Sequence, residues 1–183
     1  MRLLKSTVHP DINDLSAPTF IRKAARAIVM KEDNILLVYT QRYQDYSLPG
    51  GGIDELEDNI SGLKRELAEE TGAQNPHNIT EFGRFEEFRP CYKGEHEIVH
   101  MISYCYRCQI DEQLLAPQLE DYEIKNGMSA HWVNLHKAID HNLNTMANSD
   151  KKGLSILRET YLLQLISKEL NMEPHSKPSR HLA

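Results

Sequence analysis

Apolar and polar residues alternate, in the manner of β-strands, in four stretches of the chain: 22–30, 35–39, 79–88 and 98–110. A polar run at residues 31–34 joins the first two stretches and is typical of a hairpin turn. The charged segment 89–97 joins the last two. The pattern therefore predicts a β-sheet, to which residues 1–18 are expected to add either an edge strand or an arm.

The spacing of apolar residues becomes helical between the two strand pairs. Ile60, Leu63 and Leu67 recur at i, i+3 and i+7, which predicts a short amphipathic helix. Asn59 or Ser61 is expected to cap its first turn, because short polar side chains accept hydrogen bonds from the free N–H groups there.

Glycines lie on both sides of this predicted helix. Gly72 supplies a left-handed stop at its end. Before the helix, Pro49 is followed by three glycines, residues 50–52, which predict a turn whose backbone can approach a ligand closely.

The last third of the chain predicts a short strand and two helices. A loop at 111–129 leads to a strand at 131–133, and a helix begins over 135–141. A longer amphipathic helix covers about 153–170. The tail 172–183 is rich in Pro, Ser, Lys and His without periodicity, so we expect it to be mobile.

Length and composition fit one domain. With 183 residues, of which 40% are hydrophobic, the chain can bury one core. We therefore expect a single domain over residues 1–171, with its core at about 20–140. The order of strands and helices predicts an α/β fold with a mixed sheet flanked by helices.

Charge and hydropathy exclude some partners. The net charge of −6 argues against a nucleic-acid backbone as partner. No stretch approaches the roughly 18–20 apolar residues of a membrane span, so no membrane partner is expected. Residues 1–5 become polar before a signal-type core appears, which favours a cytoplasmic location.

The three cysteines are too few and odd in number for a disulfide framework. Cys105 and Cys108 form a C-x-x-C pair, but residues three apart in a strand point to opposite faces. Buried thiols are therefore favoured over a zinc site.

Three glutamates gather on one side of the predicted helix. Glu66, Glu69 and Glu70 lie between its apolar stripe and solvent, where like charges repel by about 0.2–0.5 kcal/mol per pair. A hard divalent cation, Mg²⁺ or Mn²⁺, would offset that cost, since it prefers oxygen ligands. The alternative is a solvated acidic face that Lys64 and Arg65 partly neutralise.

Residues 51–73 closely resemble the signature of the Nudix hydrolase family. The resemblance rests on Gly51, Glu57, Arg65, Glu66, Leu67, Glu69, Glu70, Gly72 and Ala73. Asp54 and Leu56 depart from residues common in the family, but they lie outside the defining set. The similarity is specific over about 48–73 and looser over about 20–140, and it implies the α/β/α sandwich of Nudix domains.

The resemblance implies hydrolysis of a diphosphate linkage in a nucleoside diphosphate derivative. Such a substrate would be a nucleotide sugar such as ADP-ribose, a dinucleoside polyphosphate or a nucleoside triphosphate. Mg²⁺, or Mn²⁺, would be held by Glu66, Glu69 and Glu70, with Glu57 and the Gly51 carbonyl as further ligands.

By the same resemblance, Arg65 would orient the glutamates through charged hydrogen bonds. Family members often draw the general base from a loop outside the signature, where this chain offers Glu120 and Glu123. Each of these two is equally readable as a solvated loop charge.

Substrate contacts are less determined by the sequence. Arg42, Arg89 and Lys93 are candidates for phosphates. The candidates for stacking on a base are Tyr46, Phe88, Tyr92 and Tyr122. Ordinary surface or core roles compete with each of these interpretations.

A binding module that senses a nucleotide or sugar without cleaving it is the alternative function. Loss of metal ligands would mark that outcome, and none is lost here. The C-terminal helix could pack on its own domain or on a second subunit, which leaves a homodimer open.

Overall fold

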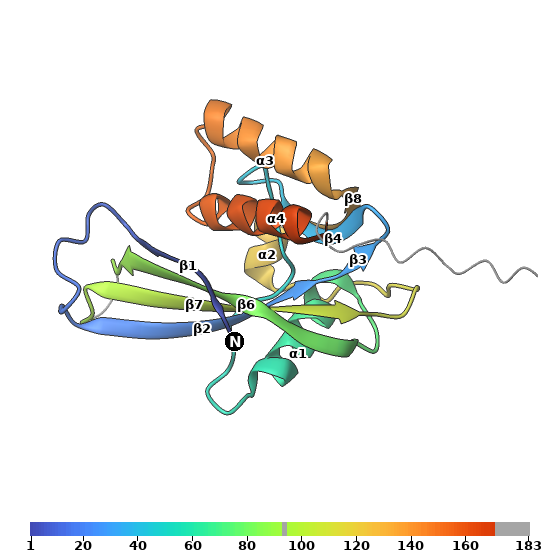
Figure 1. The fold of residues 1–183 in the computed structure, drawn as a ribbon, viewed down its shortest axis with the longest axis horizontal. Coiled ribbons are helices and arrows are strands. Elements are labelled where there is room, and N and C mark those ends of the chain that lie inside the picture. The colour runs from blue at the N-terminus through green and yellow to red at the C-terminus, as the bar shows by residue number, and fades with distance from the viewer. Residues whose placement is uncertain (93–94, 171–183) are drawn as a thin grey trace, which may run out of the picture.

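The computed structural model describes residues 1–92 and 95–170 (Figure 1). Its strands are β1 (Leu3–Val8), β2 (Thr19–Ile28), β3 (Met30–Lys31), β4 (Asn34–Thr40), β5 (Asp45–Ser47), β6 (His77–Pro90), β7 (Ile98–Gln109) and β8 (Met128–Asn134). Its helices are α1 (Asn59–Thr71), α2 (Asp121–Asn126), α3 (Leu135–Asn148) and α4 (Ile156–Leu170).

The strands form two sheets. The first has the order β1-β6-β7-β2 and is mixed, since β1 runs parallel to β6, β2 runs parallel to β7, and β6 and β7 are antiparallel. The second is antiparallel, with β8 along one edge of β4 and β3 and β5 along successive parts of the other edge. The mixed sheet flanked by helices confirms the fold class predicted from the sequence.

Helices cover the strands from two sides. In Figure 1, α3 and α4 lie on one side of the strands and α1 lies on the other. Each side has its own apolar core, and β2 contributes alternate residues to both. Ala25 and Ala27 pack with Leu63 and Leu67 of α1, whereas Ile28 belongs to the core beneath α4. This period of two is what the alternating pattern predicted.

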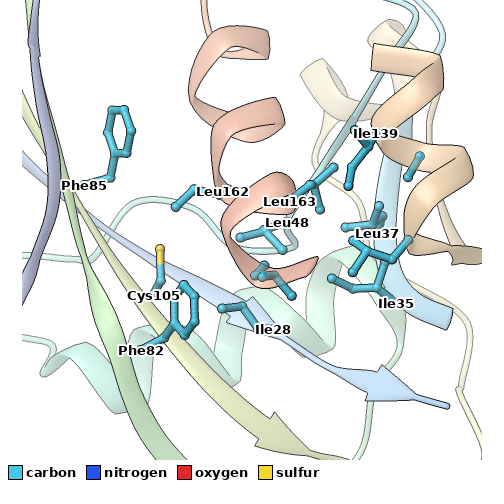
Figure 2. Close-up of a cluster of buried hydrophobic side chains, with 13 residues drawn as sticks. Ile28, Ile35, Leu37, Leu48, Phe82, Phe85, Cys105, Ile139, Leu162 and Leu163 are labelled. Atoms are coloured by element: carbon cyan, nitrogen blue, oxygen red, sulfur yellow. The ribbon is translucent and has the colours of Figure 1, made fainter. Parts of the chain in front are cut away.

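The core beneath α4 joins segments that are far apart in the chain. Figure 2 shows Leu162 and Leu163 of α4 beside Leu48, with Cys105 and Phe82 of the first sheet nearby. α4 therefore packs its apolar face on its own domain, which answers the choice that the sequence left open.

The first turn of α1 corrects the expected cap. Asp58, and not Asn59 or Ser61, is the N-cap, and its side chain accepts hydrogen bonds from the N–H groups of Ile60 and Ser61. A carboxylate also suits the positive end of the helix dipole. The other end is as expected, since Gly72 adopts φ 71° in the left-handed region.

Several element boundaries differ from those predicted. Residues 1–18 contain an edge strand, β1, and the expected loop at 111–129 contains α2. β5 was not predicted, because its three residues are too few to show a period. The tail 172–183 lies outside the described residues. Among the helices described, none is long and apolar enough to cross a membrane.

The two cysteines of the C-x-x-C pair are free and buried. Cys105 lies in the core beneath α4 and Cys108 in the core against α1, so they face opposite sides of β7. Burial raises the pKa of Cys105 to about 12 and that of Cys108 to about 11. The prediction of buried thiols in place of a zinc site agrees with this placement.

Candidate functional site

A cleft of about 280 Å³ lies where the first sheet, the glycine-containing loop 48–52 and the helices α1, α2 and α4 meet. Its lining is mostly polar and carries both signs of charge. The residues that line it are Arg22, Ala24, Arg26, Thr40, Tyr43, Asp45, Ser47, Gly50, Gly51, Gly52, Glu70, Arg89, Met101, Tyr122, Glu123, Asn126, Met128, Ser155, Arg158 and Glu159.

The loop 48–52, named the glycine loop from here on, is fixed against β2. The Ala25 N–H donates to the Gly51 carbonyl at 3.0 Å, and the Ala27 N–H donates to the Pro49 carbonyl at 2.9 Å. Gly50 has φ 132°, and a Cβ built there would lie 2.0 Å from the Ala25 carbonyl oxygen. Only glycine fits this position, because both the backbone angle and the close approach to β2 exclude a side chain.

The glycine loop also reaches the carboxylates of α1. The Gly50 N–H donates to Glu70 Oε2 at 2.5 Å. A Cβ built on Gly51 would lie 2.4 Å from Glu66 Oε2, so the Gly51 backbone and the Glu66 carboxylate are in close contact. The tertiary structure thus places the first glycine of the signature directly beside its glutamates.

Arg65 connects three of the signature glutamates to each other. Its Nη2 lies 2.9 Å from Glu57 Oε2, and its Nη1 lies 2.8 Å from Glu66 Oε1 and 3.1 Å from Glu69 Oε2. Nη2 also donates to the Gly52 carbonyl at 2.9 Å. These are the contacts expected of a guanidinium that orients carboxylates.

The signature carboxyl groups differ in how well their charge is compensated. The hydrogen bond from Arg65 holds the pKa of Glu57 below its usual value. Burial raises the pKa of Glu66 despite the contact with Arg65. Burial also raises the pKa of Glu70 to about 8, more than the nearby Arg26 and the Gly50 N–H can offset. The two carboxyl groups that approach the glycine loop therefore lack enough positive charge.

This donor set fits a hard divalent cation. Glu57, Glu66, Glu69, Glu70 and the Gly51 carbonyl offer oxygen alone, which is the preference of Mg²⁺ and Mn²⁺. Within residues 1–92 and 95–170, no three acidic, His or Cys side chains are grouped so as to hold an ion together. The reason is visible in the contacts above, because Arg65 draws Glu57, Glu66 and Glu69 to itself.

The two candidates for the general base are placed differently. Glu123 is only 4% exposed and lines the cleft from α2, while Glu120 is the N-cap of that helix and does not line the cleft. Glu123 accepts hydrogen bonds from the Glu120 N–H at 2.8 Å and from the Tyr122 hydroxyl at 3.0 Å. Its charge also contributes to the raised pKa of Glu70, so the two carboxyl groups are close enough to interact.

Of the candidates Arg42, Arg89 and Tyr46 for substrate contacts, one lines the cleft and two do not. Arg89 lines the cleft and is paired with Glu87 at 2.6 Å. Arg42 does not line it and instead donates to Asn126 Oδ1 at 3.2 Å. Tyr46 lies outside the cleft, with its ring packed 5.0 Å from that of Tyr39.

Among the proposed stacking residues, Tyr122 alone lines the cleft. The Phe88 ring stacks on His100 at 4.1 Å, and Tyr92 is exposed. Lys93 lies outside the described residues.

The arginines that β2 contributes to the cleft were not predicted from the sequence. Arg22, Ala24 and Arg26 occupy alternate positions of β2 and all line the cleft. Arg26 Nη1 donates to the Leu48 and Gly50 carbonyls of the glycine loop, and its buried Nε has no partner among the described residues. The period of two along β2 was the available signal, since it places these arginines on one face.

A buried ionic network on α4 was also missed. Arg158 donates to Glu159 Oε1 at 2.7 Å and to Glu87 on β6, and the Leu48 N–H donates to Glu159 Oε2 at 3.0 Å. Burial by itself would raise the pKa of Glu159, but Arg158 and Arg26 hold that pKa below its usual value. No local sequence signal pairs residues this far apart.

Together, the fold and the cleft define a class: an α/β domain with a loop–helix set of acidic residues beside a cleft lined by arginines and carboxyl groups. The chain matches the family model for the NUDIX domain over residues 21–155. It belongs to the Nudix family, and it is a pyrophosphohydrolase, an enzyme that hydrolyses phosphoric anhydrides.

Solved structures agree with this fold. The MutT protein from Bacillus halodurans is 21% identical, with a TM-score of 0.53 over 71% of this chain and 77% of that chain. A putative Nudix hydrolase family member from Chromobacterium violaceum is 18% identical, with a TM-score of 0.53 over 85% and 83%. A Nudix hydrolase from Nitrosomonas europaea is 15% identical, with a TM-score of 0.55 over 87% and 100%. The search of curated proteins gave no match.

Proposed function

We propose that the protein hydrolyses a diphosphate linkage in a nucleoside diphosphate derivative, with Mg²⁺ as its cation and Mn²⁺ as a substitute. The substrate is a nucleotide sugar such as ADP-ribose, a dinucleoside polyphosphate or a nucleoside triphosphate. The observation that carries the proposal is the contact of Glu66 and Glu70 with the glycine loop at the mouth of an arginine-lined cleft. We further propose that the protein acts in the cytoplasm.

The signature residues would hold the cation. Glu66, Glu69 and Glu70 are the proposed ligands, with Glu57 and the Gly51 carbonyl as additional oxygen donors. When bound, the cation supplies polarisation of phosphate oxygens and stabilisation of the charge on the leaving phosphate. Arg65 keeps three of these carboxylates oriented, as its hydrogen bonds at 2.8–3.1 Å support.

Glu123 is the proposed general base. Its burial, its position in the cleft lining and its electrostatic effect on Glu70 support this role. Glu120 is not retained for this role because it does not line the cleft. The Glu120 N–H and the Tyr122 hydroxyl fix the Glu123 carboxylate, as the orientation of a catalytic base requires.

The cleft arginines support a small anionic substrate. Arg22 and Arg26 on β2 and Arg89 on β6 line the cleft, whereas the chain as a whole carries a net charge of −6. These guanidinium groups would bind phosphate groups in a protein whose net charge would otherwise repel them. We therefore propose a small nucleotide as the partner, without a nucleic-acid or membrane partner. The homodimer that the sequence left open is not proposed through α4, whose apolar face packs within its own domain.

A substrate panel tests the proposal. ADP-ribose, other nucleotide sugars, dinucleoside polyphosphates and oxidised nucleoside triphosphates are incubated with enzyme and Mg²⁺, and phosphate-containing products are quantified. We expect hydrolysis of at least one class, and a fall of about 10²-fold or more in kcat for Glu69→Gln and Glu123→Gln.

Glu55→Gln is the matched control for these variants. Glu55 is exposed and lies close to the signature glutamates in the chain, but it is not one of the positions that define the signature. Its substitution should leave kcat unchanged. If the parent were inactive across the panel and bound the nucleotides equally well with or without Mg²⁺, the sensing module would be the better interpretation.

A further inference from the structure

Four carboxyl groups line the cleft, and one of them is not hydrogen-bonded to any other residue of the described chain. Glu70 and Glu123 each accept a hydrogen bond from a backbone N–H group. Glu159 accepts another and is paired with Arg158. The Asp45 carboxyl group accepts a hydrogen bond from its own backbone N–H, but within the described chain no hydrogen bond or ion pair joins it to another residue.

Asp45 is nevertheless almost fully buried. It is the first residue of β5, lies opposite Thr40 of β4 and is only 2% exposed. Its side chain lines the cleft on the same strand face as Ser47. Burying a carboxyl group whose only partner is its own backbone N–H is unfavourable, so such a group in a cleft points to a ligand that supplies a further hydrogen bond.

The charges around Asp45 indicate which kind of ligand group it would meet. Burial and the charge of Glu159 raise the pKa of Asp45 to about 6, which the hydrogen bond from its own backbone N–H and the charge of Arg158 offset only in part. Arg158 is itself engaged by Glu159 and Glu87. This corner of the cleft is therefore negative at neutral pH, which repels a phosphate and suits an uncharged hydrogen-bond donor.

The phosphates have a different place in the same cleft. Arg22 on β2 and Glu87 on β6 lie in one row of the first sheet, because each is paired with Met101 of β7. Arg89 lies two residues further along β6, so Arg22 and Arg89 line the cleft on either side of Met101. Within residues 1–92 and 95–170, Arg22 has no ion pair. Its guanidinium is available to an anion.

We propose that Asp45 is a specificity-determining residue, which accepts a hydrogen bond from a sugar hydroxyl or a base amino group of a nucleotide whose diphosphate lies over Arg22 and Arg89. The inference rests on the proposed function, since it takes the cleft as the nucleotide site. It adds that the enzyme distinguishes nucleotides by a donor group outside the diphosphate.

Calorimetric binding in EDTA tests the inference without hydrolysis. The ligands are ADP-ribose and three analogues that each lack donors: its 2′-deoxyadenosine form, its hypoxanthine form and ADP. We expect at least one analogue to bind the parent about 10-fold or more weakly than ADP-ribose does, since the buried Asp45 carboxyl group is then left without the donor. In Asp45→Ala all four should bind with similar affinity, and Asp45→Asn should be intermediate.

Asp140→Asn is the matched control, because Asp140 is an exposed carboxylate on α3 outside the cleft. It should keep the parent's affinities and ratios. The analogue that loses affinity identifies the donor as a hydroxyl or an amino group, and either result supports the inference. Unchanged ratios in Asp45→Ala, or no binding of any ligand to the parent, would overturn it.

The hydrolysis panel separates the two proposals. Binding that depends on Asp45, without hydrolysis of any substrate, would leave this inference standing and remove the proposed activity. If substrates are hydrolysed but the affinity ratios between ADP-ribose and its analogues are the same in Asp45→Ala as in the parent, only the inference is removed.

Discussion

The buried carboxyl groups on α1 and α4 differ in how far nearby cations and N–H groups compensate their charge. On α1, burial raises the pKa of Glu66 and takes that of Glu70 to about 8, since the nearby cations do not compensate them. On α4, Glu159 is fully buried, yet its pKa is lowered, because Arg158 and the Leu48 N–H neutralise and solvate it.

The difference distinguishes carboxyl groups that stabilise the fold from carboxyl groups that are available to bind a ligand. A fully paired carboxylate has no capacity left for a substrate or a cation, so the α4 network is structural. An undercompensated carboxyl group at a cleft is unfavourable in the free protein and becomes favourable when a ligand supplies charge or hydrogen bonds. Glu70 on α1 and Asp45 on β5 belong to this second kind.

The largest expected effect comes from breaking the paired side. Arg158→Met leaves Glu87 and Glu159 buried without their cation, which should lower the free energy of unfolding by about 3–5 kcal/mol. Chemical denaturation measures this change. Arg84→Met is the control, because Arg84 pairs with Glu86 in a more exposed setting, where loss of the pair should cost about 0–1 kcal/mol. Equal losses in the two variants would contradict the assignment.

A cation should act on the undercompensated side alone. At about 100 times its Kd, Mg²⁺ should stabilise the parent by about 2.7 kcal/mol, seen as a rise in melting temperature. Glu70→Gln keeps an acceptor for the Gly50 N–H but loses a proposed ligand, so its melting temperature should hardly respond. Glu159→Gln should respond as the parent does. Equal shifts in the parent and Glu70→Gln would place the cation elsewhere.

The smallest effect concerns Asp45 and depends on pH. Its pKa rises from 3.8 in the unfolded chain to about 6 in the fold, so the ionised form destabilises the fold above pH 6 and the penalty disappears below pH 4. Asp45→Asn should therefore be more stable than the parent at pH 8, by on the order of 1–2 kcal/mol, because cleft water screens part of the charge.

Denaturation of both proteins between pH 4 and pH 8 measures this difference. The advantage of Asp45→Asn should shrink as the pH falls from 6 to 4. An advantage that does not change with pH would show that the Asp45 charge is compensated. A variant that is more stable and binds nucleotide less well would match the usual conflict between stability and function at a site.

Local patterns in the sequence predicted the elements that depend on local physics. The helix at 59–71 and its stop at Gly72 follow from spacing and from the backbone freedom of glycine. The strand pairs follow from alternation along the chain. The cap at Asp58 was missed by one residue, because several adjacent polar side chains could serve and only the backbone angles select one.

The sequence by itself determined the family signature and thereby the residues proposed to hold a cation, because the signature residues and their spacing lie within one short segment. Only the tertiary structure decided which residues join them. Glu123 lines the cleft and Glu120 does not. Arg22, Asp45 and Arg158 also line it, although no signal in the sequence had identified them as site residues. The physical reason is that pairing and burial depend on which distant segments the sheet and α4 bring together, and no local pattern encodes that distance.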